Sequence, residues 1–253
     1  MNKAHILGKK ALNWGLDLVL PPRCPITGDT VRTVGAISPR AWKEITFIAP
    51  PYCTCCGIPF AIDLDMKGLN PDDFLCTDCI SSTRAFDQAK SLFVYDDGSR
   101  KMILSFKHGD AIHLHTTLAP LLCKTGVEFL SPDSIIVPVP LHWMRLVKRR
   151  YNQAAILGNE VAKLSGLTCW PDALIRTRPT PPQGHKTAKD RKQNVSGAFD
   201  INPPYTKKLS GREIVLIDDV FTTGATLEEC SKVLKTAGAR SVNILTLARA
   251  VKE

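Results

Sequence analysis

The stretch Ile214-Val-Leu-Ile-Asp-Asp-Val-Phe-Thr-Thr-Gly-Ala-Thr226 predicts a strand, a short loop and the start of a helix. Four apolar residues lead into two carboxylates, Asp218 and Asp219, and a loop of small, hydroxyl-bearing residues follows. From Ala225 to Ala237 the apolar residues recur at helical spacing. A helix that begins directly after such a loop presents free backbone N–H groups and the positive end of its dipole, which suits a phosphate group.

The two acids need a different ligand from the phosphate, because like charges repel one another. Carboxylates accept hydrogen bonds from sugar hydroxyls, and they coordinate hard cations such as Mg²⁺. Gly224 lets the backbone approach a ligand closely, and Thr222 and Thr223 add hydroxyl donors. Phosphate, sugar and magnesium together predict a site for a phosphorylated ribose.

Three other interpretations of this stretch are weaker. An apolar run ending in Asp-Asp also lies beside the magnesium of P-loop NTPases, but the chain has no G-x-x-x-x-G-K-[ST] sequence. The Asp-x-Asp pattern of a phosphoaspartyl enzyme is missing from the stretch. An ordinary strand–turn–helix without a ligand needs neither the paired acids nor three threonines.

Composition limits the class of protein. The chain has 253 residues, 44% of them apolar, which is enough for one large domain or two small ones with a real core. Its net charge of +9 favours anionic partners, whether phosphates, nucleotides or nucleic acid. We expect no membrane span and no secretory signal, because no apolar run is long enough for either. We therefore expect a cytoplasmic protein whose nine cysteines are reduced thiols or metal ligands.

Strand and helix patterns alternate in the second part of the chain. Strands are expected over residues 89–95, 134–140, 214–217 and 242–248, and helices over 99–107, 112–123, 152–165 and 225–237. This alternation predicts an α/β fold with a mainly parallel sheet, whose ligands bind at the carboxyl ends of the strands. We predict a small N-terminal module over residues 1–88, which begins with an amphipathic helix, and an α/β domain over residues 89–253. No internal repeat is expected.

The N-terminal module contains two Cys-x-x-Cys pairs. Cys53 and Cys56 form the first, Cys76 and Cys79 form the second, and nineteen residues separate the pairs. This spacing is close to the two-knuckle zinc pattern, although free thiols can fall at such positions by chance. Four thiolates make a closed tetrahedral zinc site, which is structural because no coordination position is left for water.

Two further cysteines complicate this pattern. Cys55 lies inside the first knuckle and in principle replaces Cys53 or Cys56, but only those two have the two-residue spacing. Cys24 begins a segment that looks like a knuckle whose second cysteine is Thr27. One thiolate cannot hold zinc alone, so we interpret Cys24 as a remnant or a packed thiol.

Two basic segments supply most of the uncompensated positive charge. Residues 138–153 carry four cations and no acid, and residues 176–194 carry six cations and one acid. Prolines and a glycine in the first half of the second segment oppose regular structure there. Such a loop either closes over a reacting centre or lies along a nucleic-acid backbone.

The stretch 214–226 resembles the phosphoribosyl-pyrophosphate (PRPP) binding motif of type I phosphoribosyltransferases, and the whole chain resembles the ComF family. The motifs that carry the second resemblance occur in order: the Cys₄ ribbon, Tyr95, Phe106-Lys-His-Gly109, Pro138-Val-Pro-Leu-x₃-Arg-x₄-Arg-Tyr-Asn-Gln153, Arg176, Thr180, Gln183, Arg191, Asn194, Ala198-Phe199, and Asp-Asp-Val-x-Thr-Thr-Gly-Ala-Thr. The chain departs from the family at Thr27, where a cysteine is usual, and at Tyr151, where we expect Phe.

The resemblance implies a zinc-ribbon region followed by a sheet of the type I phosphoribosyltransferase kind, in a cytoplasmic protein. It implies that Asp218 and Asp219 hold the ribose hydroxyls of PRPP, which binds with Mg²⁺. The residues implied to bind its phosphate groups are Val220, Thr222, Thr223, Gly224, Ala225 and Thr226, with Val139 and Arg145 in a pyrophosphate loop.

Three functional hypotheses follow. The first is transfer of a phosphoribosyl group from PRPP to an acceptor that the sequence does not name. The second, which the resemblance supports for competent bacteria, is a non-catalytic adaptor that handles single-stranded DNA with a partner helicase. The third is a zinc-ribbon nucleic-acid binder whose α/β domain only forms a homodimer, and the phosphate loop argues against it.

Overall fold

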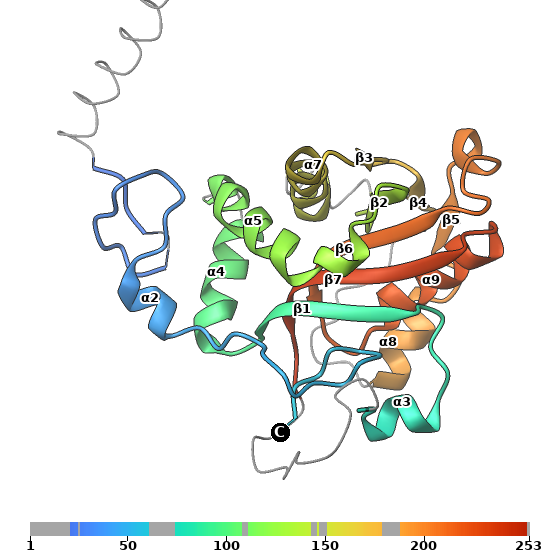
Figure 1. Cartoon of the computed structure of the whole chain (residues 1–253), viewed down its shortest axis with the longest axis horizontal. Coiled ribbons are helices and arrows are strands. Elements are labelled where there is room, and N and C mark those ends of the chain that lie inside the picture. The colour runs from blue at the N-terminus through green and yellow to red at the C-terminus, as the bar shows by residue number, and fades with distance from the viewer. Residues whose placement is uncertain are drawn as a thin grey trace, which may run out of the picture.

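A five-stranded sheet organises the structure, a computed structural model that describes residues 21–24, 26–60, 74–107, 111–142, 146, 151–178 and 188–251 (Figure 1). Its strands run in the order β1-β7-β6-β2-β3, and every neighbouring pair is parallel. Their bounds are β1 Gln88–Val94, β2 Ser134–Pro138, β3 Thr168–Cys169, β6 Glu213–Phe221 and β7 Ser241–Arg249. The predicted α/β fold with a mainly parallel sheet is therefore confirmed.

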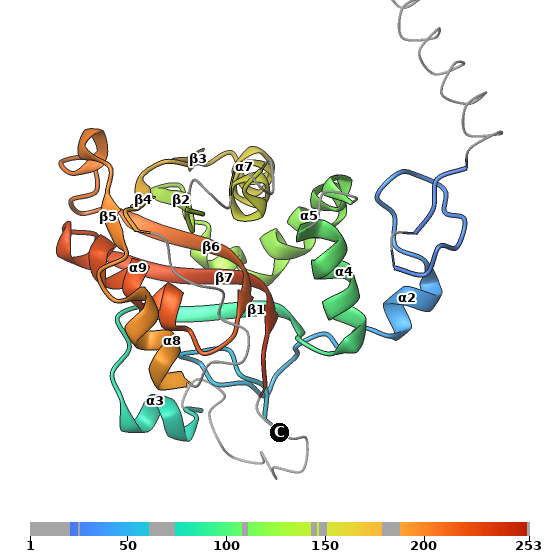
Figure 2. The same ribbon diagram turned by 180° about the vertical axis from the view of Figure 1, so that it is seen from behind.

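Helices cover both faces of the sheet (Figures 1 and 2). One face carries α4 (Asp97–Lys107), α5 (His115–Thr125) and α7 (Gln153–Ser165). The other face carries α9 (Ala225–Thr236), with α8 (Ala188–Val195) packed beside it. The remaining short elements are α2 Pro39–Lys43, α3 Thr77–Ser81, η2 Ile112–Leu114, η3 Val127–Phe129, η4 Pro203–Tyr205 and a small antiparallel sheet of β4 Leu174–Arg176 with β5 Phe199–Ile201.

Strand β6 divides its apolar side chains between the two cores. Val215 and Ile217 belong to the cluster that contains α4, α5 and α7, whereas Ile214 and Leu216 belong to the cluster that contains α9. This alternation follows from the two-residue period of a strand. If the alternation continues past Ile217, Asp218 points toward the face of the sheet that α9 covers, and Asp219 points toward the face that α4 covers.

Several element boundaries differ from the predicted ones. The strand expected over 214–217 continues to Phe221, because Asp218, Val220 and Phe221 pair with β7. The acids therefore lie on the strand rather than in the loop after it. The helix expected over 112–123 begins with the 3₁₀ turn η2, and α8 occupies the second half of the segment 176–194.

The cysteine-rich region packs along the edge strand β1. Ala89 N donates to Cys55 O at 2.8 Å, and Ile48 N donates to Leu92 O at 3.0 Å. Ile37 and Ile45 belong to the same apolar cluster as helices α4 and α5. The region thus shares a core with the sheet, and the predicted boundary between residues 88 and 89 stays a prediction.

Two sequence-based expectations concern the ends and the membrane. The amphipathic helix expected near the N-terminus lies outside the described residues. Within the described ranges, no helix is long and apolar enough to cross a membrane.

Replacing Gly57 by alanine tests how closely the cysteine-rich region docks on β1. Gly57 has a φ of +66°, and a Cβ there lies 2.6 Å from the carbonyl oxygen of Ala89. Gly211 has a φ of +72° with nothing within 4 Å of its Cβ position, so it is the matched control. Both substitutions carry the left-handed backbone penalty of about 1 kcal/mol. We expect Gly57→Ala to lose about 2 kcal/mol more in urea unfolding of the zinc-loaded protein; equal losses contradict the close docking.

Candidate functional site

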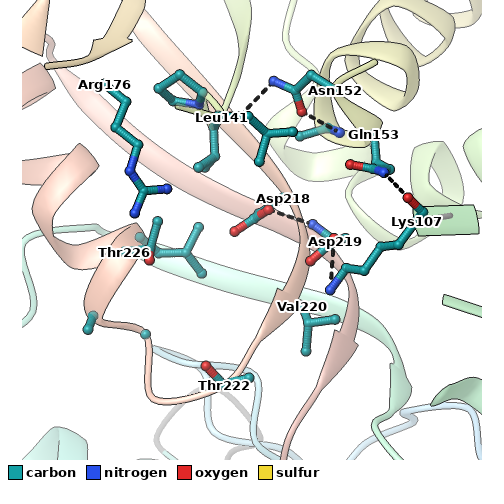
Figure 3. Close-up of a pocket in the computed structure, with 16 residues that line it drawn as sticks. Lys107, Leu141, Asn152, Gln153, Arg176, Asp218, Asp219, Val220, Thr222 and Thr226 are labelled. Atoms are coloured by element: carbon teal, nitrogen blue, oxygen red, sulfur yellow. Dashed lines mark hydrogen bonds and ion pairs between the residues drawn. The ribbon is translucent and has the colours of Figure 1, made fainter. Parts of the chain in front are cut away.

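A pocket of about 260 Å³ opens at the carboxyl edge of the sheet, where β2 and β6 end and α9 begins (Figure 3). This is the edge at which parallel sheets bind ligands. The side chains and backbone that line it come from Lys107, Val139, Pro140, Leu141, Asn152, Gln153, Ala154, Arg176, Asp218, Asp219, Val220, Thr222, Gly224, Ala225, Thr226 and Leu227.

The structure brings most of the predicted ligand-binding residues to this one pocket. Both acids, Val139, Val220, and four of the five residues from Thr222 to Thr226 line it. Thr223 is the exception: its hydroxyl is buried and has no hydrogen-bond partner in the structure. Arg145 lies outside the described residues.

The loop before α9 can be built only with glycine at position 224. Gly224 has a φ of +78°, and a Cβ there lies 2.5 Å from a ring carbon of Phe221. Its carbonyl oxygen accepts from Glu228 N at 2.8 Å, which begins the helix. The first N–H groups of α9 have no partner within the helix, so they are directed at whatever the pocket holds.

The two carboxylates of β6 have different surroundings, as the strand alternation requires. Asp219 forms an ion pair with Lys107 of α4 at 3.1 Å (Figure 3). Asp218 accepts a hydrogen bond from the backbone N–H of Asp219 at 2.8 Å, and Arg176 of β4 reaches toward it from the other side. The pocket therefore places a negative pair between two cations.

Asp218 holds its proton more tightly than an ordinary aspartate. Removal from water raises the pKa of Asp218 to about 7, and the neighbouring charge of Asp219 acts in the same direction. The hydrogen bond from the Asp219 backbone and the charges of Lys107 and Arg176 oppose this rise. The acid pair can therefore bind a proton near neutral pH.

Sequence reasoning missed four polar residues of the pocket: Lys107, Asn152, Gln153 and Arg176. Each lies in a motif that carried the family resemblance, but no pattern showed which of those residues face the pocket. Asn152 caps α7 by accepting from Ala154 N at 3.1 Å, and its amide donates to Val139 O at 3.0 Å. Gln153 donates to the carbonyl oxygen of Lys107 at 2.8 Å, so it holds the end of α4 at the pocket.

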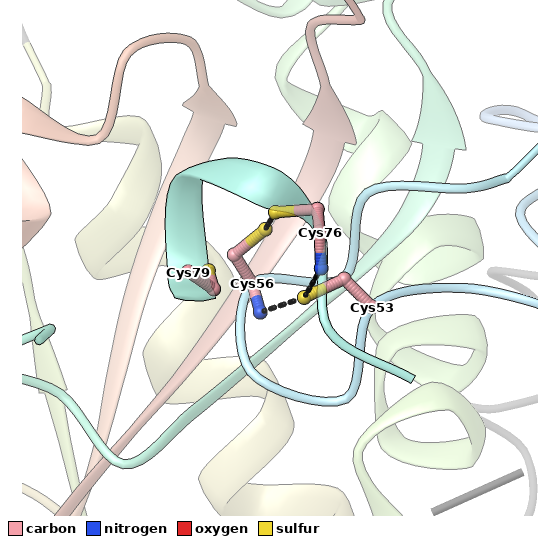
Figure 4. A group of neighbouring side chains, drawn as sticks. All are labelled: Cys53, Cys56, Cys76 and Cys79. Carbon is pink, nitrogen blue, oxygen red and sulfur yellow. Dashed lines mark hydrogen bonds between the residues drawn. The ribbon is translucent and has the colours of Figure 1, made fainter. Parts of the chain in front are cut away.

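The predicted zinc ligands form a tight cluster beside the sheet (Figure 4). The sulfur atoms of Cys53, Cys56, Cys76 and Cys79 all lie within 4.8 Å of one another. The Cys56 and Cys76 sulfurs are 3.6 Å apart, close to the roughly 3.8 Å that tetrahedral zinc–thiolate bonds of about 2.3 Å require. Cys55 is not among the four. The donor set and its spacing thus fit a structural zinc ion.

Two backbone hydrogen bonds in this cluster converge on one sulfur atom. The backbone N–H groups of Cys56 and Cys76 donate to the Cys53 sulfur at 3.5 Å and 3.3 Å. The hydrogen bond from the Cys56 thiol is the largest of the causes that lower the pKa of Cys53 to about 4. Thiolates are the form in which cysteines bind zinc.

Arg249 connects the cysteine cluster to the loop before α9. It is 7% exposed and stands at the end of β7. Its guanidinium donates to Cys56 O at 3.3 Å, to Phe221 O at 3.2 Å and to Thr222 O at 2.7 Å. It also lies 4.0 Å from the ring centre of Phe221. One buried cation therefore fixes both regions.

Comparison with known proteins agrees with this architecture. A family model described as a double zinc ribbon domain matches residues 15–80, and one described as a phosphoribosyl transferase domain matches residues 174–252. Competence protein F of Haemophilus influenzae is 31% identical to the chain, over 79% of this chain and 85% of that protein. The DNA utilization protein YhgH of Salmonella typhimurium is 29% identical, over 78% and 83%, and competence protein ComFC of Bacillus subtilis is 28% identical, over 82% and 81%.

The fold and the two matched domains define a zinc-ribbon protein with a phosphoribosyltransferase-like α/β domain. Within that class, the chain belongs to the ComF family, the family of competence protein F. The resemblance on which the sequence analysis relied is confirmed.

Replacing Asp218 by asparagine should stabilise the ligand-free protein at alkaline pH. An unfolded aspartate ionises near pH 3.8 and Asp218 in the fold at about 7, so its contribution to stability is lost as pH rises through about 7. At pH 8 we expect Asp218→Asn to raise the free energy of unfolding by roughly 1 to 4 kcal/mol, since one pKa unit equals about 1.4 kcal/mol. At pH 5, which lies between the two pKa values, the gain should be less than half of that at pH 8, and it should vanish only below the unfolded pKa.

Urea unfolding at the two pH values measures this effect, with Asp133→Asn as the matched control because Asp133 is exposed. If Asp218→Asn is less stable than the wild type at pH 8, the raised pKa of Asp218 is contradicted.

Proposed function

We propose that the pocket binds PRPP with Mg²⁺ and that the protein transfers the phosphoribosyl group to an acceptor. The observation that carries this proposal is the convergence, at one pocket, of two carboxylates, the N-terminus of α9 and two cations. A phosphorylated sugar with a pyrophosphate leaving group requires all three features. The match of residues 174–252 to the phosphoribosyl transferase domain supports it.

The 5′-phosphate would lie against the backbone from Thr222 to Thr226, where α9 begins. The glycine at position 224 keeps that surface open, because any side chain there collides with Phe221. Asp218 and Asp219 would accept hydrogen bonds from the two ribose hydroxyls. Since they lie on opposite faces of β6, each carboxylate would take one hydroxyl rather than sharing both.

The pyrophosphate would lie beside the loop that follows β2. The N–H of Val139 donates to Ile217 O at 2.9 Å, so it belongs to the sheet and is not a ligand donor. Proline at position 140 has no N–H, which makes Leu141 the first residue of the loop whose backbone can donate to an oxygen of the ligand. Val139 would contribute only apolar contact, and Arg145 remains a predicted ligand of this loop.

Lys107 and Arg176 would balance the charge that develops on the leaving group. Catalysis would come from orienting C1 of the ribose and from holding the departing pyrophosphate by fixed donors. Magnesium, when bound, supplies further positive charge at the pyrophosphate. Among the pocket-lining residues Asp218 and Asp219 are the carboxylates that can hold it. Zinc at the four cysteines would leave no open coordination position, so its role is structural.

Calorimetric titration of PRPP with Mg²⁺ tests the site. We expect binding by the wild type and a loss of at least tenfold in affinity for Asp218→Asn and for Asp219→Asn, since a hydrogen bond to a charged group contributes about 1.5 to 3 kcal/mol. Wild-type affinity should increase as pH rises through about 7, because the Asp218 carboxylate ionises there. Ionisation of PRPP itself changes the affinity of both proteins equally. The additional increase in affinity that comes from Asp218 should be absent in Asp218→Asn.

Asp133→Asn is the control, and it should bind as the wild type does. No heat from a folded, zinc-loaded wild type contradicts the binding site. Binding without pyrophosphate release in the presence of candidate acceptors contradicts the transfer step alone.

A second function, handling of single-stranded DNA in the cytoplasm together with a helicase, is favoured by two observations. The net charge is +9, and the relatives are a DNA utilization protein and two competence proteins. The exposed Arg178 belongs to the second basic segment and lies two residues after Arg176, which lines the pocket. Such binding would be mainly electrostatic.

Fluorescence anisotropy of a labelled oligo-dT tests this second function. Affinity should fall by about tenfold or more between 50 and 200 mM salt, as expected for about three phosphate contacts. Arg178→Gln should reduce the slope of log affinity against log salt by roughly 0.7, whereas Lys124→Gln on α5 should leave it unchanged. Absence of binding at 50 mM salt, or an affinity that salt does not change, contradicts DNA binding.

A further inference from the structure

The described residues of the segment 22–31, all but position 25, have the same backbone hydrogen bonds as the zinc knuckle at residues 51–60. In both segments the cysteine and the glycine four residues later hold a turn, and both glycines have positive φ, +74° at Gly28 and +66° at Gly57. An antiparallel bridge closes each segment, Arg23 with Thr30 and Tyr52 with Pro59. The matching bonds are Cys24 N to Asp29 O with Cys53 N to Ile58 O, Gly28 N to Cys24 O with Gly57 N to Cys53 O, and Val31 N to Pro22 O with Phe60 N to Pro51 O.

The second half of the zinc ribbon has a counterpart as well. Ser38 is the N-cap of the five-residue helix α2, as Cys76 is of the five-residue helix α3. Trp42 N donates to Ser38 O at 3.0 Å, and Ile80 N donates to Cys76 O at 3.0 Å.

The cysteine of each segment is also approached in the same way. The backbone N–H of Cys76 donates to the Cys53 sulfur at 3.3 Å. Burial opposes ionisation of the Cys24 thiol, and the backbone of Ser38 is the largest of the influences that lower its pKa to about 7, so Ser38 approaches this sulfur as Cys76 approaches that of Cys53. Ser38 therefore stands where Cys76 stands in the zinc ribbon, and Ala41, three residues later, stands where Cys79 stands.

This correspondence identifies four positions that would hold a metal in a complete ribbon: Cys24, Thr27, Ser38 and Ala41. They supply one thiol, two neutral hydroxyls and a methyl group, whereas zinc in proteins is bound by thiolate, imidazole and carboxylate. In the described part of the chain, the one group of three or more metal-binding side chains with suitable spacing is the Cys53 cluster. The residues of the first ribbon do not fit a zinc ion.

Hydrogen bonds occupy the place of the metal in the first ribbon. The hydroxyls of Thr27 and Ser38 are 2.9 Å apart and hydrogen-bonded, and Thr27 donates to the carboxylate of Asp29 at 2.8 Å. Ala41 N donates to the Ser38 hydroxyl at 3.2 Å. Cys24 and Ala41 are buried in the apolar cluster of α4 and α5.

We propose that residues 22–43 are a ribbon that has lost its metal site and is held by this hydrogen-bond network, so that the chain binds one zinc ion although it matches a double zinc ribbon model. The expectation of no internal repeat is accordingly wrong. Pro21-Pro-Arg-Cys-Pro-Ile-Thr-Gly28 and Pro50-Pro-Tyr-Cys-Thr-Cys-Cys-Gly57 share the two prolines, the first cysteine and the glycine.

Zinc content per chain, measured by mass spectrometry of the purified full-length protein, tests the stoichiometry. The wild type should contain about one zinc ion, Cys24→Ser should still contain about one, and Cys53→Ser/Cys76→Ser should contain none. Two zinc ions in the wild type, or a loss of zinc in Cys24→Ser, overturns the proposal.

Restoring the missing ligands tests whether the four positions are truly equivalent. Thr27→Cys/Ser38→Cys/Ala41→Cys should bind about two zinc ions, and cobalt substitution should double the tetrahedral thiolate absorption. A folded triple variant that keeps one zinc ion overturns the correspondence.

Amide hydrogen exchange tests the same proposal on the wild-type protein, so it does not depend on whether a variant folds. Chelation of zinc should deprotect the amides of residues 53–60 and leave those of residues 24–31 protected. Equal deprotection of both segments overturns the metal-free ribbon.

Discussion

The buried guanidinium of Arg249 is the contact on which both the cysteine cluster and the phosphate loop depend. A charged group removed from water needs compensation, and backbone carbonyls supply only part of it. Its carbonyl partners include those of Cys56 and Thr222, and it also lies 3.8 Å from the Cys56 sulfur. A zinc ion with four thiolates carries a net charge of −2, so the loaded cluster would provide the missing counter-charge. The cysteine cluster and the loop that lines the pocket are thereby joined by one side chain.

The pocket itself is a place where the repulsion between like charges lowers the stability of the fold. Two adjacent carboxylates repel each other, and the strand alternation leaves Asp219 paired with Lys107 while Asp218 stays partly removed from water. Perturbed ionisation of this kind is concentrated at functional sites. A ligand that brings hydroxyl donors would relieve the strain on Asp218, since each donor favours the charged form of the carboxylate it contacts. Hydroxyl donors in this pocket would therefore favour the ionised form of Asp218.

Local patterns predicted the parts of the site that are contiguous in sequence. The apolar run, the two acids and the small-residue loop predicted β6, α9 and their junction, and the two Cys-x-x-Cys pairs predicted the metal cluster. Lys107 and Arg176 could not be assigned in this way, because they reach the pocket only through the packing of α4 and β4. Arg249 gave no signal either, since its role depends on the pairing of β7 with β6. Half of the first ribbon was visible in the sequence as an incomplete knuckle at Cys24 and Thr27, whereas its other half, at Ser38 and Ala41, has no cysteine that could have indicated it.

The two ribbons show which structural task requires a metal. The first packs against α4 and α5 through apolar side chains, and neutral hydrogen bonds suffice to close it. The second lies under the phosphate loop and faces the buried Arg249. If neutral hydroxyls replaced the cysteines of the second ribbon, backbone carbonyl oxygens would be the remaining partners of the Arg249 guanidinium, and no negative charge would lie beside it. The ribbon closed by neutral hydrogen bonds thus lies against an apolar core, and the ribbon with four clustered cysteines lies against a buried positive charge that contacts the loop of the candidate active site.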